Sequence, residues 1–117
     1  FPVAISTSGQ ANWSAGEQKI RDSILIILST VTGEHVLMPT FGCRINELVF
    51  ASNNGTTRAL AQTYVTEALR TWEPRIEVSD VTVSMDPTMP NALPIRIDYV
   101  VRETNNAGNL VYPFLLK

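Results

Sequence analysis

Eleven carboxylates, one histidine and one cysteine are the first side chains to consider for catalysis in this chain of 117 residues. Glycoside hydrolysis needs two carboxylates that face each other across a cleft, roughly 5 to 9.5 Å apart. Glu73 and Glu77 could approach each other, but a proline and the start of an extended segment separate them. His35 and Cys43 have no cluster of carboxylates beside them with which to hold a metal. Because no nucleophile elbow or phosphate loop is present either, we expect no catalytic residue, no metal and no cofactor.

The segment Glu73-Pro74-Arg75 offers binding chemistry instead. Pro74 disfavours helical dihedral angles at Glu73, so a preceding helix is predicted to end there. A carboxylate is unfavourable at a helix C-terminus unless a nearby cation compensates its charge, and Arg75 is the obvious cation. Two interpretations stay open. The pair could lock the corner internally, worth at most about 1 kcal/mol if exposed, or contact a partner in a desolvated interface, where truncation costs more.

Composition and charge narrow the classes of protein. Hydrophobic residues make up 44% of the chain and charged residues 17%, against a typical charged share of about 25%. This suits a protein packed against others, and equally a small, mildly apolar soluble domain. The net charge of −2 gives no electrostatic case for nucleic acid or an anionic membrane. A lone cysteine indicates a reducing compartment, and no apolar run approaches the roughly 18 residues of a membrane span.

The first segments predict an arm followed by a helix. Residues 1–13 are of mixed composition and are expected to form a flexible or partner-ordered arm, with residues 14–117 as one domain. Ser14 and Glu17 match a capping box. Leu25 and Ile26 make the helix apolar nearly all round, so we expect another protein to cover its second side. A strand is the alternative for this aliphatic run, but the capping box favours a helix. The apolar residues at helical spacing are Ile20, Ile24, Ile27, Leu28 and Val31.

A connector follows, with residues that restrict the backbone. Gly33 is placed to close the helix, and residues 34–41 are predicted to be extended, because Pro39 excludes a helix. Phe41 is an expected aromatic anchor, and Gly42 is expected to supply a conformation or close approach that other residues resist.

A short helix is predicted over residues 44–50, burying Ile45, Leu48 and either Val49 or Phe50, and a turn over 51–56. The strongest helical period comes next, with Thr56 or Thr57 as its cap and Pro74 as its end. Its apolar stripe comprises Leu60, Ala61, Tyr64, Val65, Ala68, Leu69 and Trp72.

Alternating residues after Pro74 predict strands. The apolar parity changes between Val78 and Val81, which predicts a bulge at Ser79-Asp80. Residues 95–101 alternate cleanly. A turn over 105–109 should return the chain as a hairpin strand over 110–116. Pro113 lacks an amide donor and therefore belongs on a sheet edge, which is either protected by this proline or a docking site. The expected class is α+β, with N-terminal helices packed on a small, mainly antiparallel sheet that ends in a β-hairpin.

Five blocks, in this order and spacing, resemble the phage baseplate protein W family. They are residues 23–30 (SILIILST), 33–35 (GEH), 39–44 (PTFGCR), 72–76 (WEPRI) and 95–99 (IRIDY). The family includes baseplate wedge subunits of contractile-tailed phages and sheath-initiator subunits of type VI secretion and related contractile injection systems. The chain departs from it at His35, where the family commonly has Arg.

The resemblance implies a structural protein, in six copies, between the wedge proteins and the sheath. It implies that Glu73, Pro74 and Arg75 contact the helical core of the wedge, and that the β part templates the first sheath ring by strand pairing. Tube or spike-hub proteins are further expected partners, with assembly in the bacterial cytoplasm. The residues expected to pair with sheath strands are Leu110, Val111, Tyr112, Phe114 and Leu115. The expected structural motif comprises Gly33, Pro39, Phe41, Gly42 and Trp72.

Two other interpretations remain. Some family members have been labelled lysozymes, so a peptidoglycan-cleaving enzyme is one alternative. A generic cytosolic α+β adaptor domain is the other.

Overall fold

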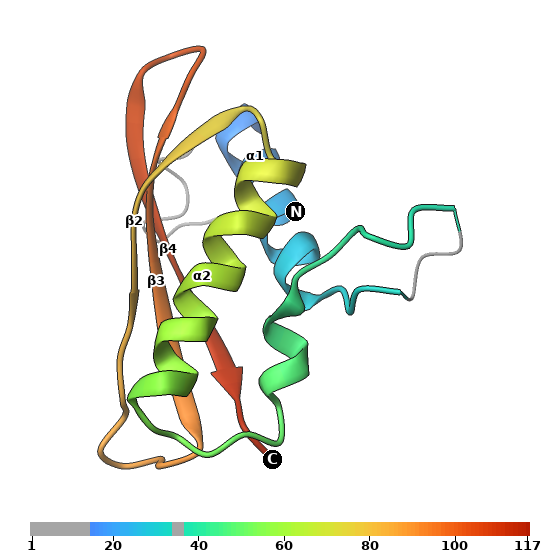
Figure 1. Ribbon diagram of the computed structural model, residues 1–117. Helices are drawn as coiled ribbons and strands as arrows, with labels where there is room; N and C mark the ends of the chain where they lie inside the picture. Colours follow the sequence, from blue (N-terminus) through green and yellow to red (C-terminus); the bar gives the residue numbers. More distant parts are fainter. Residues whose placement is uncertain (1–14, 34–36) are drawn as a thin grey trace.

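The computed structural model describes residues 15–33 and 37–117, which form two layers (Figure 1). Helices α1 and α2 lie on one face of a three-stranded antiparallel sheet with the order β2-β3-β4. The predicted α+β class, with helices first and a C-terminal hairpin, is confirmed. The elements are α1 (Ala15–Ser29), the 3-10 helix η2 (Arg44–Leu48), α2 (Gly55–Trp72), β2 (Ile76–Val83), β3 (Ala92–Val101) and β4 (Asn106–Leu115).

The hydrophobic core lies between the helices and the inner face of the sheet. The central strand β3 contributes every second side chain, because alternate residues of a strand point to opposite faces. The outer face of the sheet is not covered by any element of the described chain. The most deeply buried apolar side chains are Ile24, Ile27, Leu28, Ile45, Val65, Leu69, Leu93, Ile95 and Ile97.

Helix α1 confirms the helical interpretation of the aliphatic run, but it ends at Ser29, before Val31. Leu25 and Ile26 are 38% and 58% exposed, so this side of the helix is open in the described chain. Ser14, the predicted cap, lies outside the described residues, as do residues 1–13 and His35.

The predicted roles of Gly33 and of the connector are wrong in detail. Gly33, with a φ of 95°, does not close the helix, which ends at Ser29; its amide donates to the carbonyl of Pro39 at 2.8 Å. The amide of Phe41 donates to Met38 at 2.9 Å, which makes a turn where an extended segment was expected. The end of α1 is held instead by Asn46, whose side-chain amide donates to the carbonyls of Leu28 and Thr30.

Two predictions about the second helix are corrected. The cap of α2 is Asn54, whose side chain accepts from the amide of Thr57 at 2.9 Å. Thr57 is buried and does not cap. Of the residues expected inside, Leu60 is 38% exposed, and in the segment after η2 it is Val49, not Phe50, that packs against the core.

The sheet confirms the bulge and corrects the turn. The pairing of β2 with β3 shifts between Val78 and Asp80. The hairpin turn comprises residues 102–105, and β4 starts at Asn106. Gly108, which suggested the later turn, pairs with Tyr99 in the sheet, and a Cβ there would lie 2.8 Å from the tyrosine ring. The glycine therefore makes room for an aromatic ring, a role that local turn signals do not distinguish.

Candidate functional site

The Glu73-Pro74-Arg75 corner joins α2 to β2. Glu73 is the C-cap of α2, and its amide still donates to the carbonyl of Leu69. Its ψ of 75° is not helical, as expected of a residue before proline. The turn after α2 is also tied to the hairpin end of β3, because Arg102 donates from its backbone amide to the carbonyl of Arg75 and from Nε to that of Pro74. The corner is therefore fixed from the helix and from the sheet.

Glu73 and Arg75 form a two-pronged ion pair within this corner. Nε and Nη2 of Arg75 donate to the two carboxylate oxygens of Glu73 at 2.7 and 2.9 Å. The side chain of Glu73 is only 1% exposed, whereas that of Arg75 is 51% exposed. The acid thus faces the protein and the cation faces outward, an asymmetry that the sequence did not predict.

A third residue, Ser23 of α1, completes the environment of the carboxylate. Burial opposes ionisation of Glu73, but the hydrogen bonds from Arg75 and from the Ser23 hydroxyl, with the charge of Arg75, hold the pKa of Glu73 below its ordinary value. The carboxylate of Glu73 is therefore ionised at neutral pH. Ser23 lies 50 residues away in sequence, and no local signal linked it to the corner.

A cavity of about 790 Å³ opens beside Arg75, between the start of α1 and the β3–β4 hairpin. Its apolar lining includes Ile20 and Val101, and its charged lining includes Glu17, Arg102 and Glu103 beside Arg75. Arg75 therefore borders both the corner and a hollow large enough for a partner side chain.

Residues of the predicted structural motif have two kinds of role. Some pack through their side chains, and others set the conformation of the backbone. The rings of Phe41 and Trp72 meet edge to face, with centroids 5.1 Å apart. Gly42 has a φ of 119°, and a Cβ there would lie 2.4 Å from the carbonyl oxygen of Thr30. The conformation and close approach expected at Gly42 are both present. This contact lets the amide of Cys43 donate to the same carbonyl at 3.0 Å.

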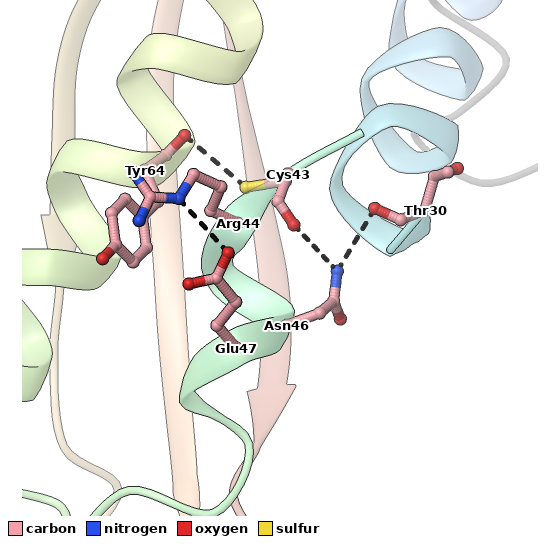
Figure 2. A network of polar contacts seen from close by, with 6 residues as sticks. All are labelled: Thr30, Cys43, Arg44, Asn46, Glu47 and Tyr64. Carbon is pink, nitrogen blue, oxygen red and sulfur yellow. Dashed lines mark hydrogen bonds and ion pairs between the residues drawn. The ribbon is translucent and has the colours of Figure 1, made fainter. Parts of the chain in front are cut away.

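A second polar cluster, which the sequence did not predict, lies where η2 meets α2 (Figure 2). The guanidinium of Arg44 lies 4.5 Å from the ring centroid of Tyr64, a cation–π distance, and its Nε donates to Glu47 at 3.2 Å. Both charged side chains are about half exposed.

Burial raises the pKa of the Cys43 thiol to about 11, so this thiol stays protonated and unreactive at neutral pH.

The predicted sheath-pairing residues are divided between the two faces of β4. Leu110 and Phe114 are buried in the core, and Tyr112 packs partly against it. Val111 and Leu115 are 56% and 49% exposed on the outer face. Val111 and Leu115 are thus open to a partner and Tyr112 is partly exposed, while pairing of these five residues with a sheath strand stays a prediction.

The outer edge of β4 is the second candidate interface. The carbonyl of Asn109 points away from β3, because it accepts a hydrogen bond from Arg21 of α1. Alternation along the strand then directs the backbone groups of Val111 and Pro113 outward as well. In the described part of the chain, no strand pairs with this edge. Pro113 is on an edge strand, as predicted, and its register partner in β3 is Pro94.

No group of three His, Cys, Asp or Glu side chains among the described residues could hold a metal ion. Glu77 is 70% exposed and near Arg102, whereas Glu73 is enclosed in the corner. Among the described helices, no segment combines the length and the hydrophobicity that a membrane span requires.

Comparisons with known proteins agree on one family. Residues 14–106 match the family model of the baseplate wedge protein gp25. The chain is 28% identical over 88 residues to the baseplate wedge protein gp25 of Enterobacteria phage T4, covering 75% of this chain and 60% of that relative. The chain thus spans less than two thirds of the relative's length.

Three solved structures share the fold. A protein of Geobacter sulfurreducens described as a candidate tail lysozyme is 50% identical, with a TM-score of 0.81 over 90% of this chain and 95% of that one. Chains of a type VI secretion baseplate complex and of the anti-feeding prophage baseplate give TM-scores of 0.70 and 0.62. The type VI secretion chain is 17% identical and the alignment covers 86% of this chain and 93% of that one. The anti-feeding prophage chain is 16% identical, with 89% of this chain and 72% of that one covered. Likeness at this level of identity shows the fold alone. Because the family model matches most of its length, the chain belongs to the baseplate wedge protein gp25 family.

Proposed function

We propose that this chain is a structural baseplate subunit of a contractile injection machine, where it links the wedge proteins to the sheath. Its β4 edge would template the first sheath ring by pairing with a sheath strand. The family supports the baseplate setting, and assembly would take place in the bacterial cytoplasm before the subunit becomes part of the baseplate. Six copies per baseplate, with tube or spike-hub proteins as further neighbours, belong to the same proposal.

The open edge of β4 is the observation that carries the sheath proposal. Outward amide and carbonyl groups at Val111 and a carbonyl at Pro113 are the groups that an added strand would bind. The exposed side chains of Val111 and Leu115 lie on the same strand and would flank the new partner. Pro113 interrupts the row of donors, which limits unspecific pairing of this edge.

The Glu73-Pro74-Arg75 corner supports the wedge contact. Arg75 is half exposed, held in a fixed geometry and next to a large hollow. Pro74 is exposed beside it. Glu73 would act through Arg75, because it has almost no surface of its own.

Cosedimentation with the sheath protein of the same system tests the sheath half. We expect the wild-type chain to pellet with polymerised sheath and Val111→Pro to remain in the supernatant, because proline removes the outward amide. The matched control is Val111→Thr, which keeps the amide and nearly the same side-chain shape. If Val111→Pro pellets like wild type, strand pairing at this edge is refuted.

We propose further that the chain is not catalytic. The description of the Geobacter protein as a candidate tail lysozyme favours the opposite, so the enzyme needs its own test. A general acid must be protonated when it acts, whereas Glu73 is ionised and enclosed. Purified cell walls should therefore keep their turbidity with the wild-type chain. Turbidity loss that disappears with Glu73→Gln would establish an enzyme.

A further inference from the structure

We propose that Arg21 of α1 is a cap on the outer edge of β4, and that this cap keeps a second copy of the chain from pairing with the edge. The inference goes beyond the proposed function, because it concerns the free subunit and holds whether or not a sheath strand binds there. Two observations carry it: the direction of the backbone groups along β4, and one hydrogen bond from α1.

The register of β4 with β3 fixes the direction of its backbone groups. Pro94 pairs with Pro113, and the carbonyl of Pro94 accepts from the amide of Ser84, which follows β2, at 3.0 Å. The backbone groups of Pro94 therefore point toward β2, so those of Pro113 point away from β3. Successive residues of an antiparallel strand alternate in this direction, and the register has no shift along β4. The amides and carbonyls of Asn109 and Val111 thus point outward as well.

Arg21 already binds one of these outward carbonyl groups. Its Nη1 donates to the carbonyl oxygen of Asn109, and a hydrogen bond from an ionised donor is stronger than one between neutral groups. Gly108, the neighbour of Asn109, carries no side chain that could lie between α1 and this carbonyl. A cavity of about 190 Å³ brings these residues together, with a lining that includes Arg21, Tyr99, Gly108 and Asn109.

An uncapped edge would fit a second copy of the same strand. Two identical edges pair antiparallel about a twofold axis, so Asn109 of each copy could lie opposite Val111 of the other. The two residues would exchange amide and carbonyl hydrogen bonds. Registers that bring Pro113 opposite either residue lose a donor, whereas registers that avoid Pro113 use the carbonyl of Asn109. There the incoming amide must compete with the guanidinium of Arg21.

Proline and charge therefore protect this edge together, as they do at the sheet edges of many natural proteins. Pro113 removes a donor toward the end of β4, and Arg21 occupies an acceptor nearer its start. Val111 lies between them, and its outward groups are those on which the proposed sheath pairing depends. The cap thus disfavours pairing between copies and leaves Val111 accessible.

Sedimentation velocity of the isolated full chain tests the cap. Arg21→Met keeps an unbranched apolar stem and removes the donor, so we expect it to dimerise at a concentration about tenfold lower than wild type. Arg21→Lys, which keeps a cationic donor, should recover most of this difference. Lys19→Met is the matched control, because it makes a similar change at an exposed position of the same helix, and it should sediment like wild type.

Val111→Pro in the Arg21→Met background locates the contact between copies. Because proline removes the outward amide, this double variant should be monomeric, whereas Val111→Thr in the same background should dimerise like Arg21→Met. Dimers of the Val111→Pro double variant would place the association elsewhere and overturn the inference. An Arg21→Met chain that sediments like wild type would also overturn it. Neither result bears on sheath pairing, which the cosedimentation of Val111→Pro tests separately.

NMR of the dilute, monomeric chain checks the hydrogen bond itself. The carbonyl ¹³C chemical shift of Asn109 should change in Arg21→Met, because its acceptor loses a charged donor, and stay at the wild-type value in Lys19→Met. An Asn109 carbonyl shift that Arg21→Met leaves unchanged would show that Arg21 does not cap this group.

Discussion

The corner at Arg75 and the edge of β4 present two different kinds of surface. At the corner, the buried carboxylate of Glu73 holds the guanidinium of Arg75 through two hydrogen bonds. At the edge, the outward groups belong to the backbone, and the side chains of Leu110 and Phe114 are used for the core. A site built from side chains depends on residue identity, whereas a site built from backbone depends on conformation. A change of side chain should therefore weaken binding at the corner more than at the edge. A change of backbone conformation should do the reverse.

Deleting residues 110–117 should have the largest effect, because it removes most of a core strand. Leu110, Phe114 and Leu116 are each 5–6% exposed, and burial of a large apolar side chain contributes about 1.5–3 kcal/mol. The loss is comparable with the whole stability of a small domain, about 5–15 kcal/mol. We expect an unfolded or insoluble chain, visible by circular dichroism. The edge cannot therefore be tested by truncation, and a truncated chain with native ellipticity would show that β4 is dispensable.

Arg75→Ala should have the second-largest effect. It leaves Glu73 buried without its cation, so we expect both a loss of about 1–3 kcal/mol in unfolding free energy and the failure of wedge binding. Arg75→Lys separates the two effects, since a lysine retains charge but not the two-pronged geometry. We expect it to recover most of the stability and less of the affinity, measured by urea unfolding and wedge pull-down. Full affinity in Arg75→Lys would contradict a geometric role.

Acid should weaken the corner. The pKa of Glu73 is below its ordinary value of 4.5, so its contribution to stability is present above that value and is lost as pH falls through the lower, folded-state pKa. Melting temperatures of wild type and Glu73→Gln should therefore differ most near neutral pH and converge as pH falls well below 4.5. A constant difference from pH 7 to pH 3 would show that the ionised carboxylate is not what stabilises the corner.

Substitution of an exposed side chain at the β4 edge should have a smaller effect than the changes at the corner. Leu115→Ser removes an exposed apolar contact and leaves the backbone groups in place, so we expect sheath cosedimentation to weaken by less than about fivefold. Loss of all sheath binding would show that the side chain, and not the backbone, makes the contact.

Breaking the exposed pair Arg44–Glu47 should have the smallest effect on stability. This pair also serves as a control for the buried pair at the corner. Its donor-to-acceptor distance, 3.2 Å, is only slightly longer than those of Arg75, but both partners are about half exposed. Exposed pairs contribute about 0–1 kcal/mol. Glu47→Gln should therefore change the unfolding free energy by less than about 0.5 kcal/mol, clearly less than Glu73→Gln. Equal effects would mean that burial does not distinguish the two pairs.

The sequence predicted those features that depend on neighbouring residues. Pro74 restricts Glu73 directly, so the end of α2 was predictable, as was the bulge near Ser79 from the change of parity. The contact of Ser23 with Glu73 could not be predicted, because it forms only when α1 packs against the corner. Gly108 misled the turn prediction for the same reason, since its role depends on the ring of Tyr99 across the sheet. The direction of the backbone at Val111 likewise required the register of β4.

Reconstituted baseplates that carry Val111→Pro test most directly whether the two surfaces act separately. We expect mass spectrometry to find the variant in wedge complexes at the wild-type ratio, because its Arg75 corner is unchanged, and electron microscopy to find no sheath on them. Sheaths of normal length and number on these baseplates, or loss of the variant from the wedge, would contradict the account.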